Sequence, residues 1–218
     1  TETVTRSTVA LVTPAGKAFC TGSLITSTAV VTAAHCIQDY PYDRIYVAFG
    51  TKATEGNFAR ARLRYAKKVH GHASYSEALM QAEAPSGPPS DIALLRLNEK
   101  APDGFYATKL LSANQALTVG EALTLAGFGQ QSWDGDDAGV LNKVDVKLTK
   151  VDRVAKEVHF GASNGRSACM GASGGPAFVT RGGTLYLVGV TSRGSSHCDS
   201  DGIYTDARQF TDWIKERL

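Results

Sequence analysis

The sequence predicts an all-β protein made of two small barrels of about equal size. Short strand-like runs with turn residues between them recur at regular spacing along the 218 residues. Helical periodicity is convincing only at the end of the chain, which argues against alternating strands and helices. The segment between residues 108 and 122 reads as a connector. We therefore expect a first barrel over 1–112 and a second over 113–218.

The individual elements follow from these runs. The expected strands are 9–13, 23–34, 44–50, 91–97, 122–129, 140–151, 176–180 and 184–192. The segment 206–218 has Phe210, Trp213, Ile214 and Leu218 at helical spacing, which predicts an amphipathic helix docked on the body of the protein. The segments 74–90 and 130–139 are rich in turn residues and polar, so we expect exposed loops that form the walls of a cleft.

The composition excludes several classes of protein. The formal net charge is +2, from 23 basic and 21 acidic residues, and no basic run is dense enough for a nucleic-acid partner. Every apolar stretch is shorter than the roughly 18 to 20 residues of a membrane span. The first residues, TETVTRSTV, do not form a signal peptide, and removal of one is compatible with this sequence.

The four cysteines form two pairs that are local in sequence, Cys20 with Cys36 and Cys169 with Cys198. No CxxC spacing is present, and the neighbouring histidines do not form a strong zinc pattern, although His35 directly precedes Cys36, so disulfides are preferred over a metal site. Disulfides persist outside a reducing cytosol, which predicts a secreted or periplasmic protein.

Three stretches place residues of hydrolytic chemistry in the order His, Asp, Ser. They are TAAHC with His35, SDIALLRL with Asp91, and GASGGP with Ser173. Acyl transfer by a serine needs a base to accept the hydroxyl proton and a carboxylate that holds this base in the right tautomer. We therefore predict that Ser173 is the nucleophile, His35 the base and Asp91 the orienting carboxylate.

The same chemistry needs backbone amides that face the developing oxyanion. Gly171 permits the unusual backbone dihedrals that would point its own N–H group and that of Ser173 inward. Gly174 and Gly175 would let the chain turn tightly behind the serine. The oxyanion hole is therefore assigned to Gly171 and Ser173.

These motifs resemble the chymotrypsin-like (trypsin-fold) serine proteases over nearly the whole chain. FCTGSLITSTAVVTAAHC is similar to the family's first disulfide hairpin, DIALLRL to its aspartate strand, AGFG to a strand of its second barrel, and GIYTDARQFTDWI to its closing strand and helix. The resemblance implies two perpendicular six-stranded β-barrels, with the triad in the cleft between them. It also implies disulfides Cys20–Cys36 and Cys169–Cys198, and hydrolysis of proteins or peptides by a monomer without cofactor or metal.

The resemblance assigns a substrate pocket as well. Ser167, six positions before the serine, would form the pocket base, with Ser192, Gly194 and Gly202 along its walls. A base without a carboxylate and walls without large side chains would accept a large apolar or aromatic side chain. Arg193 stands where the family usually has tryptophan, and it would instead favour an acidic substrate residue.

Other charged residues at the pocket rim leave this preference open. Asp199 and Asp201 would favour a basic substrate residue, and His197 resembles the histidine of glutamyl-specific relatives, although an exposed loop histidine is the simpler interpretation. The other histidines lack a pattern of metal ligands, so we expect surface or structural roles for them. They are His70, His72 and His159.

Ala172 departs from the family, which usually has an aspartate before the serine. In relatives this aspartate pairs with the N-terminal amine released by zymogen cleavage. Ala172 cannot form that pair, Ala18 replaces a histidine of many zymogens, and the chain begins TETV instead of an IVGG-like start. We therefore expect an enzyme that needs no N-terminal insertion, as in some bacterial relatives.

Two alternatives remain open at this stage. One is a latent protease that a partner or substrate activates. The other is an inactive homologue that acts as a binding protein. An activating partner or an inhibitor is therefore also a candidate partner of this chain.

Overall fold

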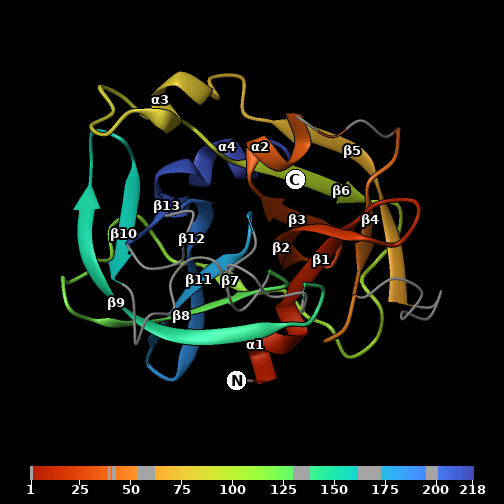
Figure 1. The fold of residues 1–218 in the computed structure, drawn as a ribbon. Helices are drawn as coiled ribbons and strands as arrows, with labels where there is room; N and C mark the ends of the chain where they lie inside the picture. The colour runs from red at the N-terminus through yellow and green to blue at the C-terminus, as the bar shows by residue number, and fades with distance from the viewer. Residues whose placement is uncertain are drawn as a thin grey trace.

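The computed structural model describes residues 2–38, 40, 43–53, 62–129, 138–161, 173–194 and 201–218. Two barrels lie side by side, the first on the right and the second on the left in Figure 1. Each is closed, six-stranded and antiparallel, which confirms the predicted fold class.

The first barrel has the strand order β1-β2-β3-β6-β5-β4 and is closed by pairing between β1 and β4. Its strands are β1 (Thr8–Val12), β2 (Ala18–Thr26), β3 (Ala29–Thr32), β4 (Tyr46–Ala48), β5 (Leu63–Gly71) and β6 (Ala93–Leu97). Both faces of β1 are buried, because Val9 and Leu11 point into this barrel while Ala10 and Val12 pack with Phe128 of the second half. The apolar run of β1 therefore joins the two halves.

The second barrel has the order β11-β8-β9-β10-β13-β12 and is closed by pairing between β11 and β12. Its strands are β8 (Ala122–Gly127), β9 (Asn142–Asp152), β10 (Glu157–Gly161), β11 (Pro176–Arg181), β12 (Thr184–Arg193) and β13 (Gly202–Asp206). The short strand β7 (Lys109–Leu110) runs parallel to β12 at the outside of this sheet. Phe160 and Tyr204 meet edge to face in the core, with ring centroids 4.9 Å apart.

The helices are short and lie at the margins of the barrels. They are α1 (Glu2–Ser7), α2 (Ala34–Gln38), α3 (Glu77–Gln81), the 3-10 helix η3 (Ala207–Phe210) and α4 (Thr211–Lys215). Ser76 caps α3, since its Oγ accepts a hydrogen bond from the Leu79 N–H group at 3.2 Å. Within the described residues, no helix has the length and apolar character that a membrane crossing requires.

Several elements differ from the sequence prediction. The run 23–34 is two strands, because a turn at residues 27 and 28 separates β2 from β3. Strand β5 was not predicted, since it carries exposed residues in succession at Lys67, Lys68 and Val69. The segment 74–90, expected to be a loop, contains α3. Most of the other expected loop, residues 130–137, lies outside the described residues.

The predicted C-terminal helix is divided into η3 and α4. Phe210 and Ile214 are buried in the first barrel's core cluster, as expected, but Leu218 is 47% exposed. The prediction that Leu218 docks on the body is therefore wrong, because α4 ends at Lys215 and the residues after it do not continue the buried helical face.

A buried ion pair fixes the start of this C-terminal segment. Arg208 donates hydrogen bonds from Nε to Asp206 Oδ1 at 2.9 Å and from Nη2 to Asp206 Oδ2 at 2.7 Å. Its Nη1 donates to the Gln115 carbonyl at 2.7 Å, which ties η3 to the connector between the two halves. The two side chains are only 5% and 2% exposed, so the pair is almost fully removed from water.

Replacing Arg208 by alanine should therefore destabilise the protein strongly. The change leaves the Asp206 carboxylate buried without its cation, which costs about 3–5 kcal/mol in free energy of unfolding. Urea denaturation followed by tryptophan fluorescence would measure this loss. Arg153, which is exposed on the turn before β10, provides the matched control. A loss in Arg208→Ala as small as that in Arg153→Ala would contradict the interpretation.

Candidate active site

His35 lies on α2, directly after β3, and a disulfide holds this helix. Cys36 is bonded to Cys20 of β2, with an S–S length of 2.08 Å and a Cα–Cα distance of 6.3 Å. This confirms the first predicted disulfide. The second pair, Cys169 and Cys198, lies outside the described residues. The histidine therefore sits on a short helix that is covalently joined to the neighbouring strand.

Asp91 is buried just before β6 and contacts His35 at two points. Its Oδ1 accepts the His35 backbone N–H at 2.9 Å, and its Oδ2 lies 2.7 Å from His35 Nδ1. The Asp91 side chain is fully buried, whereas that of His35 is 20% exposed. An ionised carboxylate only accepts hydrogen bonds, so Nδ1 carries the proton and Nε2 of a neutral ring is left as the acceptor.

The second barrel completes the surroundings of Asp91. Ser192 of β12 donates from Oγ to Asp91 Oδ2 at 2.7 Å, and Thr205 of β13 donates from Oγ1 to the Asp91 carbonyl at 2.9 Å. Ser90, just before Asp91, has a left-handed backbone with φ of 55°. The carboxylate is thus held by groups from both barrels.

Ser173 is placed next to His35 by its backbone. Its carbonyl accepts the Thr21 N–H at 2.9 Å and lies 3.4 Å from Cys36 Sγ. Gly174 follows with φ of +84°, and a Cβ built there would lie 2.1 Å from Thr32 Oγ1. Only glycine fits this position, which agrees with the tight turn expected behind the serine.

The side chain of Ser173 is not joined to His35 by a hydrogen bond within the described part of the chain. Such a bond is often long before a substrate binds. Gly171, predicted to form the oxyanion hole with Ser173, lies outside the described residues, as does Ala172. The structure thus holds the main chain of Ser173 against Thr21 and against Cys36, which follows His35 in sequence.

The predicted pocket residues fall in different places. Ser192 points to Asp91 and is 4% exposed, Gly194 is exposed, and Gly202 is buried at the start of β13. Asp201 Oδ2 accepts a hydrogen bond from Thr149 Oγ1 at 3.4 Å. The pocket base Ser167 and the rim residues His197 and Asp199 lie outside the described residues.

Arg193 forms a buried ion pair that the sequence did not reveal. It donates from Nη1 to Glu157 Oε1 at 2.5 Å and from Nη2 to Glu157 Oε2 at 3.1 Å. The side chains are 19% and 2% exposed. Arg193 lies on β12 and Glu157 on β10, so the pair spans β13, which runs between them. Glu157 lies opposite Thr205 on the neighbouring strand, and the Thr205 side chain reaches Asp91. The ion pair therefore lies on the face of the second barrel that is turned toward the His35–Asp91 pair.

His159 lies on the same face of β10 as Glu157, two residues farther along. Its Nε2 is buried and has no hydrogen-bond partner among the described residues. Burial lowers the pKa of His159 below its usual value, and the nearby Glu157 carboxylate opposes this only in part. The neutral ring is therefore favoured in the folded protein.

Two of these contacts could not be predicted from the sequence. Ser192 was expected to line the pocket, and no motif indicated its bond to Asp91. Glu157, in the stretch KEVHFG, carried no signal at all. Both contacts depend on strand neighbours that are distant in sequence, which spacing alone does not show.

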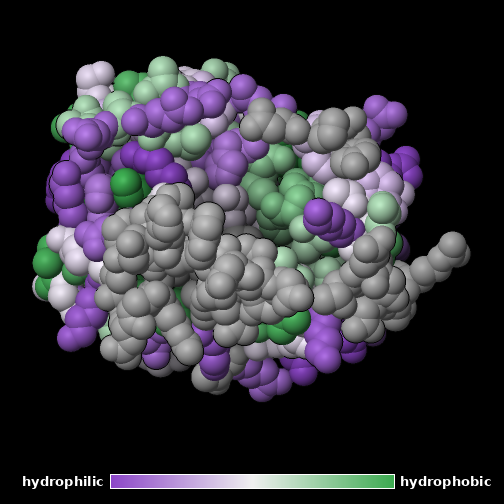
Figure 2. All heavy atoms as spheres, viewed as in Figure 1, coloured by the Kyte–Doolittle hydropathy of each residue, from purple (hydrophilic) through white to green (hydrophobic). Residues whose placement is uncertain are grey.

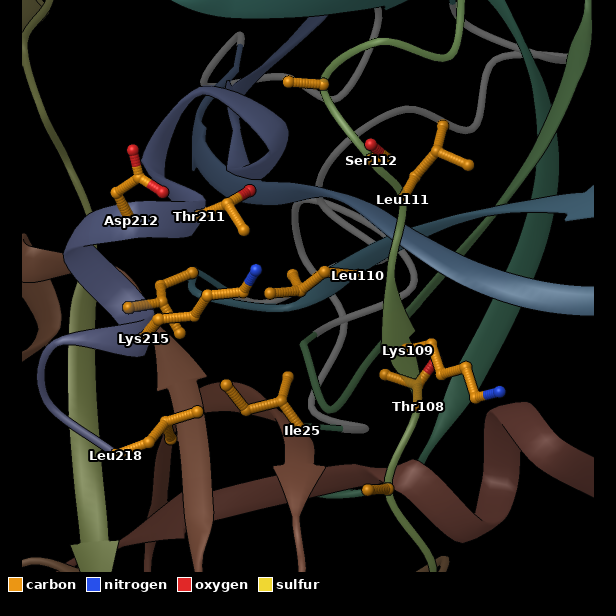
Figure 3. Close-up of a pocket in the computed structure, with 13 residues that line it drawn as sticks. Ile25, Thr108, Lys109, Leu110, Leu111, Ser112, Thr211, Asp212, Lys215 and Leu218 are labelled. Carbon is orange, nitrogen blue, oxygen red and sulfur yellow. The ribbon is translucent and has the colours of Figure 1, made fainter.

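A separate cavity of about 630 Å³ lies between β7 and the C-terminal helix. Figure 3 shows Lys215 and Leu218 on one side of it and Leu110 opposite. None of its lining residues belongs to the His35–Asp91 pair.

On the face seen in Figure 2, hydrophobic residues gather in a recess over the first barrel, and the surface around this recess is largely hydrophilic. Among the described residues, no cluster of three or more His, Cys, Asp or Glu side chains is arranged to hold a metal ion.

Comparison with known proteins gives matches to serine proteases of the trypsin family. The sequence matches the family model described as Trypsin over residues 2–214. It is 31% identical to coagulation factor XII of Sus scrofa over 229 residues, which covers 92% of this chain and 36% of that protein. It is 30% identical to a venom serine protease of Polistes dominula over 213 residues, covering 87% of this chain and 72% of that protein. The chain thus spans little more than a third of the factor XII relative.

The low pKa of His159 makes stability depend on pH. As the pH falls below about 6.5, the unfolded chain takes up a proton that the folded His159 resists, so the free energy of unfolding should decrease. In the His159→Gln variant, the free energy of unfolding should decrease less between about pH 7 and 5 than it does in the wild type. Urea denaturation at several pH values would measure both slopes.

His70 and His72 also have lowered pKa values, so the stability of the His159→Gln variant should still depend on pH to some extent. Equal slopes in the wild type and His159→Gln would show that His159 does not contribute.

Proposed function

The chain belongs to the trypsin family of serine proteases, and from this premise we propose that it is a secreted endopeptidase with Ser173, His35 and Asp91 as its triad. The observation that carries the proposal is the two-point contact of 2.9 and 2.7 Å between Asp91 and His35. That contact directs Nε2 of the imidazole away from Asp91, where a base is needed. The confirmed disulfide supports secretion.

The mechanism follows from these positions. Nε2 of His35 accepts the Ser173 hydroxyl proton as Oγ attacks the scissile carbonyl carbon. The backbone N–H groups of Gly171 and Ser173 stabilise the oxyanion, and Asp91 stabilises the imidazolium. His35 then donates the proton to the leaving amine, which gives an acyl-enzyme. A water molecule activated by His35 hydrolyses this ester and restores Ser173.

Activity without N-terminal insertion is the second part of the proposal. Ala172 provides no carboxylate for an N-terminal ion pair. The chain after it is held in other ways, because the Gly174 N–H donates to the Thr191 carbonyl at 2.9 Å and the Thr191 N–H donates to the Gly175 carbonyl at 2.8 Å. Together with the bond from Thr21 to Ser173, these contacts support a serine that is positioned from its C-terminal side.

The uncharged Ser167, which the family resemblance assigns to the pocket base, supports a preference for a large apolar or aromatic side chain before the scissile bond. Arg193 does not oppose this, because both of its outer nitrogens are bound to the Glu157 carboxylate. We further propose that residues 1–112 and 113–218 act as one peptidase unit and that the chain is a monomer acting on proteins or peptides.

A latent protease is the second candidate. The observation that favours it is the missing hydrogen bond between Ser173 and His35 in the described residues, combined with Ala172. In that case a partner or substrate would complete the site by selecting an ordered conformation. An inactive binding homologue is favoured less, since binding alone does not need the buried Asp91–His35 contact.

Reaction with a fluorophosphonate, followed by intact mass, tests the triad. We expect one adduct, located on Ser173 by peptide mapping, because the reagent needs an activated serine and a receptive oxyanion hole. Ser173→Ala should give no adduct, and His35→Ala should react slower by about three orders of magnitude. A folded wild-type chain without adduct would favour the latent form, and labelling restored by a partner would confirm it.

The Glu157–Arg193 pair leads to a prediction about specificity. In Glu157→Gln the Arg193 charge is no longer neutralised, so the enzyme should prefer substrates with a negatively charged side chain near Arg193. The test uses pairs of peptides that carry either Asp or Asn at one of the four positions before the scissile bond. At one of these positions, the kcat/KM for the Asp peptide divided by that for the Asn peptide should be about tenfold higher in the variant than in the wild type.

The double variant Glu157→Gln with Arg193→Gln is the matched control, because it keeps the neutral carboxamide but removes the cation. Its Asp/Asn ratios should return to those of the wild type. If Glu157→Gln alone leaves every ratio unchanged, then Arg193 does not contact the substrate.

A further inference from the structure

A line of cations and aromatic rings, most of them partly buried, crosses the C-terminal segment. Lys156 Nζ lies 5.5 Å from the ring centroid of Phe210, and the Phe210 ring lies 5.4 Å from that of His72. The His72 ring is 5.0 Å from Trp213, and Arg217 Cζ lies 4.4 Å from the Trp213 ring centroid. These contacts connect the turn before β10 with the end of the chain beyond α4.

The line continues onto the first barrel. On neighbouring antiparallel strands, Lys68 of β5 lies directly opposite Arg96 of β6, and His70 lies on the same face two residues from Lys68. Burial and then the charges of Arg217, Lys68 and Arg96 lower the pKa of His70, which agrees with the strand register that places Lys68 and Arg96 near it. We call the set Lys156, Arg217, Lys68 and Arg96, with His72 and His70 between them, the cationic band.

The cationic band is hardly compensated by acidic residues. Within the described parts of the chain, no carboxylate lies within 4.0 Å of Lys68, Arg96 or Lys156. Arg217 is 3.7 Å from Glu216, which is 74% exposed and so weakly paired. Like charges placed directly opposite on two strands are destabilising, as with Lys68 and Arg96. A bound anion would remove this repulsion.

The form of the cationic band indicates the kind of anion. The cations follow one another across several elements, which fits an extended chain with repeated negative groups. Single-stranded nucleic acid would also use open aromatic faces for its bases. Here Phe210 is 4% exposed and Trp213 already contacts His72 and Arg217. We propose that the cationic band binds a sulfated polysaccharide, recognised through charge and hydrogen bonds to its sulfates.

Fluorescence anisotropy with a fluorescein-labelled heparin oligosaccharide tests this proposal on the full chain. The wild type should bind, and the affinity should fall with added salt because counterions compete. The double variant Lys68→Ala with Arg96→Ala should raise Kd by at least about tenfold at about 0.1 M NaCl. Its melting temperature should be unchanged or higher, since a like-charge pair is removed.

The matched control replaces Lys17 and Lys147, which are exposed and lie in the β1–β2 turn and on β9. Their double alanine variant removes the same charge and should change Kd by less than about threefold. The proposal is wrong if the wild type does not bind, if both double variants lose affinity equally, or if single-stranded DNA of matched charge competes as well as unlabelled heparin. Binding is measured without hydrolysis, so this result and that of the fluorophosphonate are independent.

Discussion

The site depends on the buried carboxylate of Asp91. An ionised carboxylate without partners is too costly to bury, so its position is stable only where donors converge on it. His35 supplies two donors from the first barrel, and Ser192 supplies a third from the second. Thr205 holds the main chain of Asp91 as well. Since neither barrel provides all of these groups, docking of the two barrels and assembly of the site are one event.

Main-chain constraints position the serine against this pair. The Ser173 carbonyl is bound by Thr21, and Gly174 leaves no room for a side chain beside Thr32. Cys36, next to His35 in sequence, lies against the same carbonyl and is bonded to Cys20. The histidine and the serine therefore share one rigid neighbourhood around β2 and β3, although they are far apart in the chain.

Strands with apolar runs, such as β1, β6 and β12, could be predicted from the sequence because burial determines their residue types. His35, Asp91 and Ser173 could be proposed from the sequence because their motifs are local, and the structure places Asp91 against His35. Strand β5 was missed because much of it faces solvent, so no alternation of apolar residues marks it. The Glu157–Arg193 pair could not be predicted, because it joins strands β10 and β12 across β13 and only the folded register brings them together.

The net charge of +2 does not show that some cations are buried in ion pairs while others, among the described residues, lack an acidic partner. Arg193 and Arg208 are bound to carboxylates and shielded from water, so they contribute little to the field outside the protein. Lys68, which is exposed, and Arg96, which is partly buried, have no such partners within the described residues, and the strand register places them directly opposite each other. In physiological salt their field decays over about 8 Å. It therefore acts only on a ligand that touches the surface, whereas the paired charges of Arg193 and Arg208 act mainly on their own carboxylates.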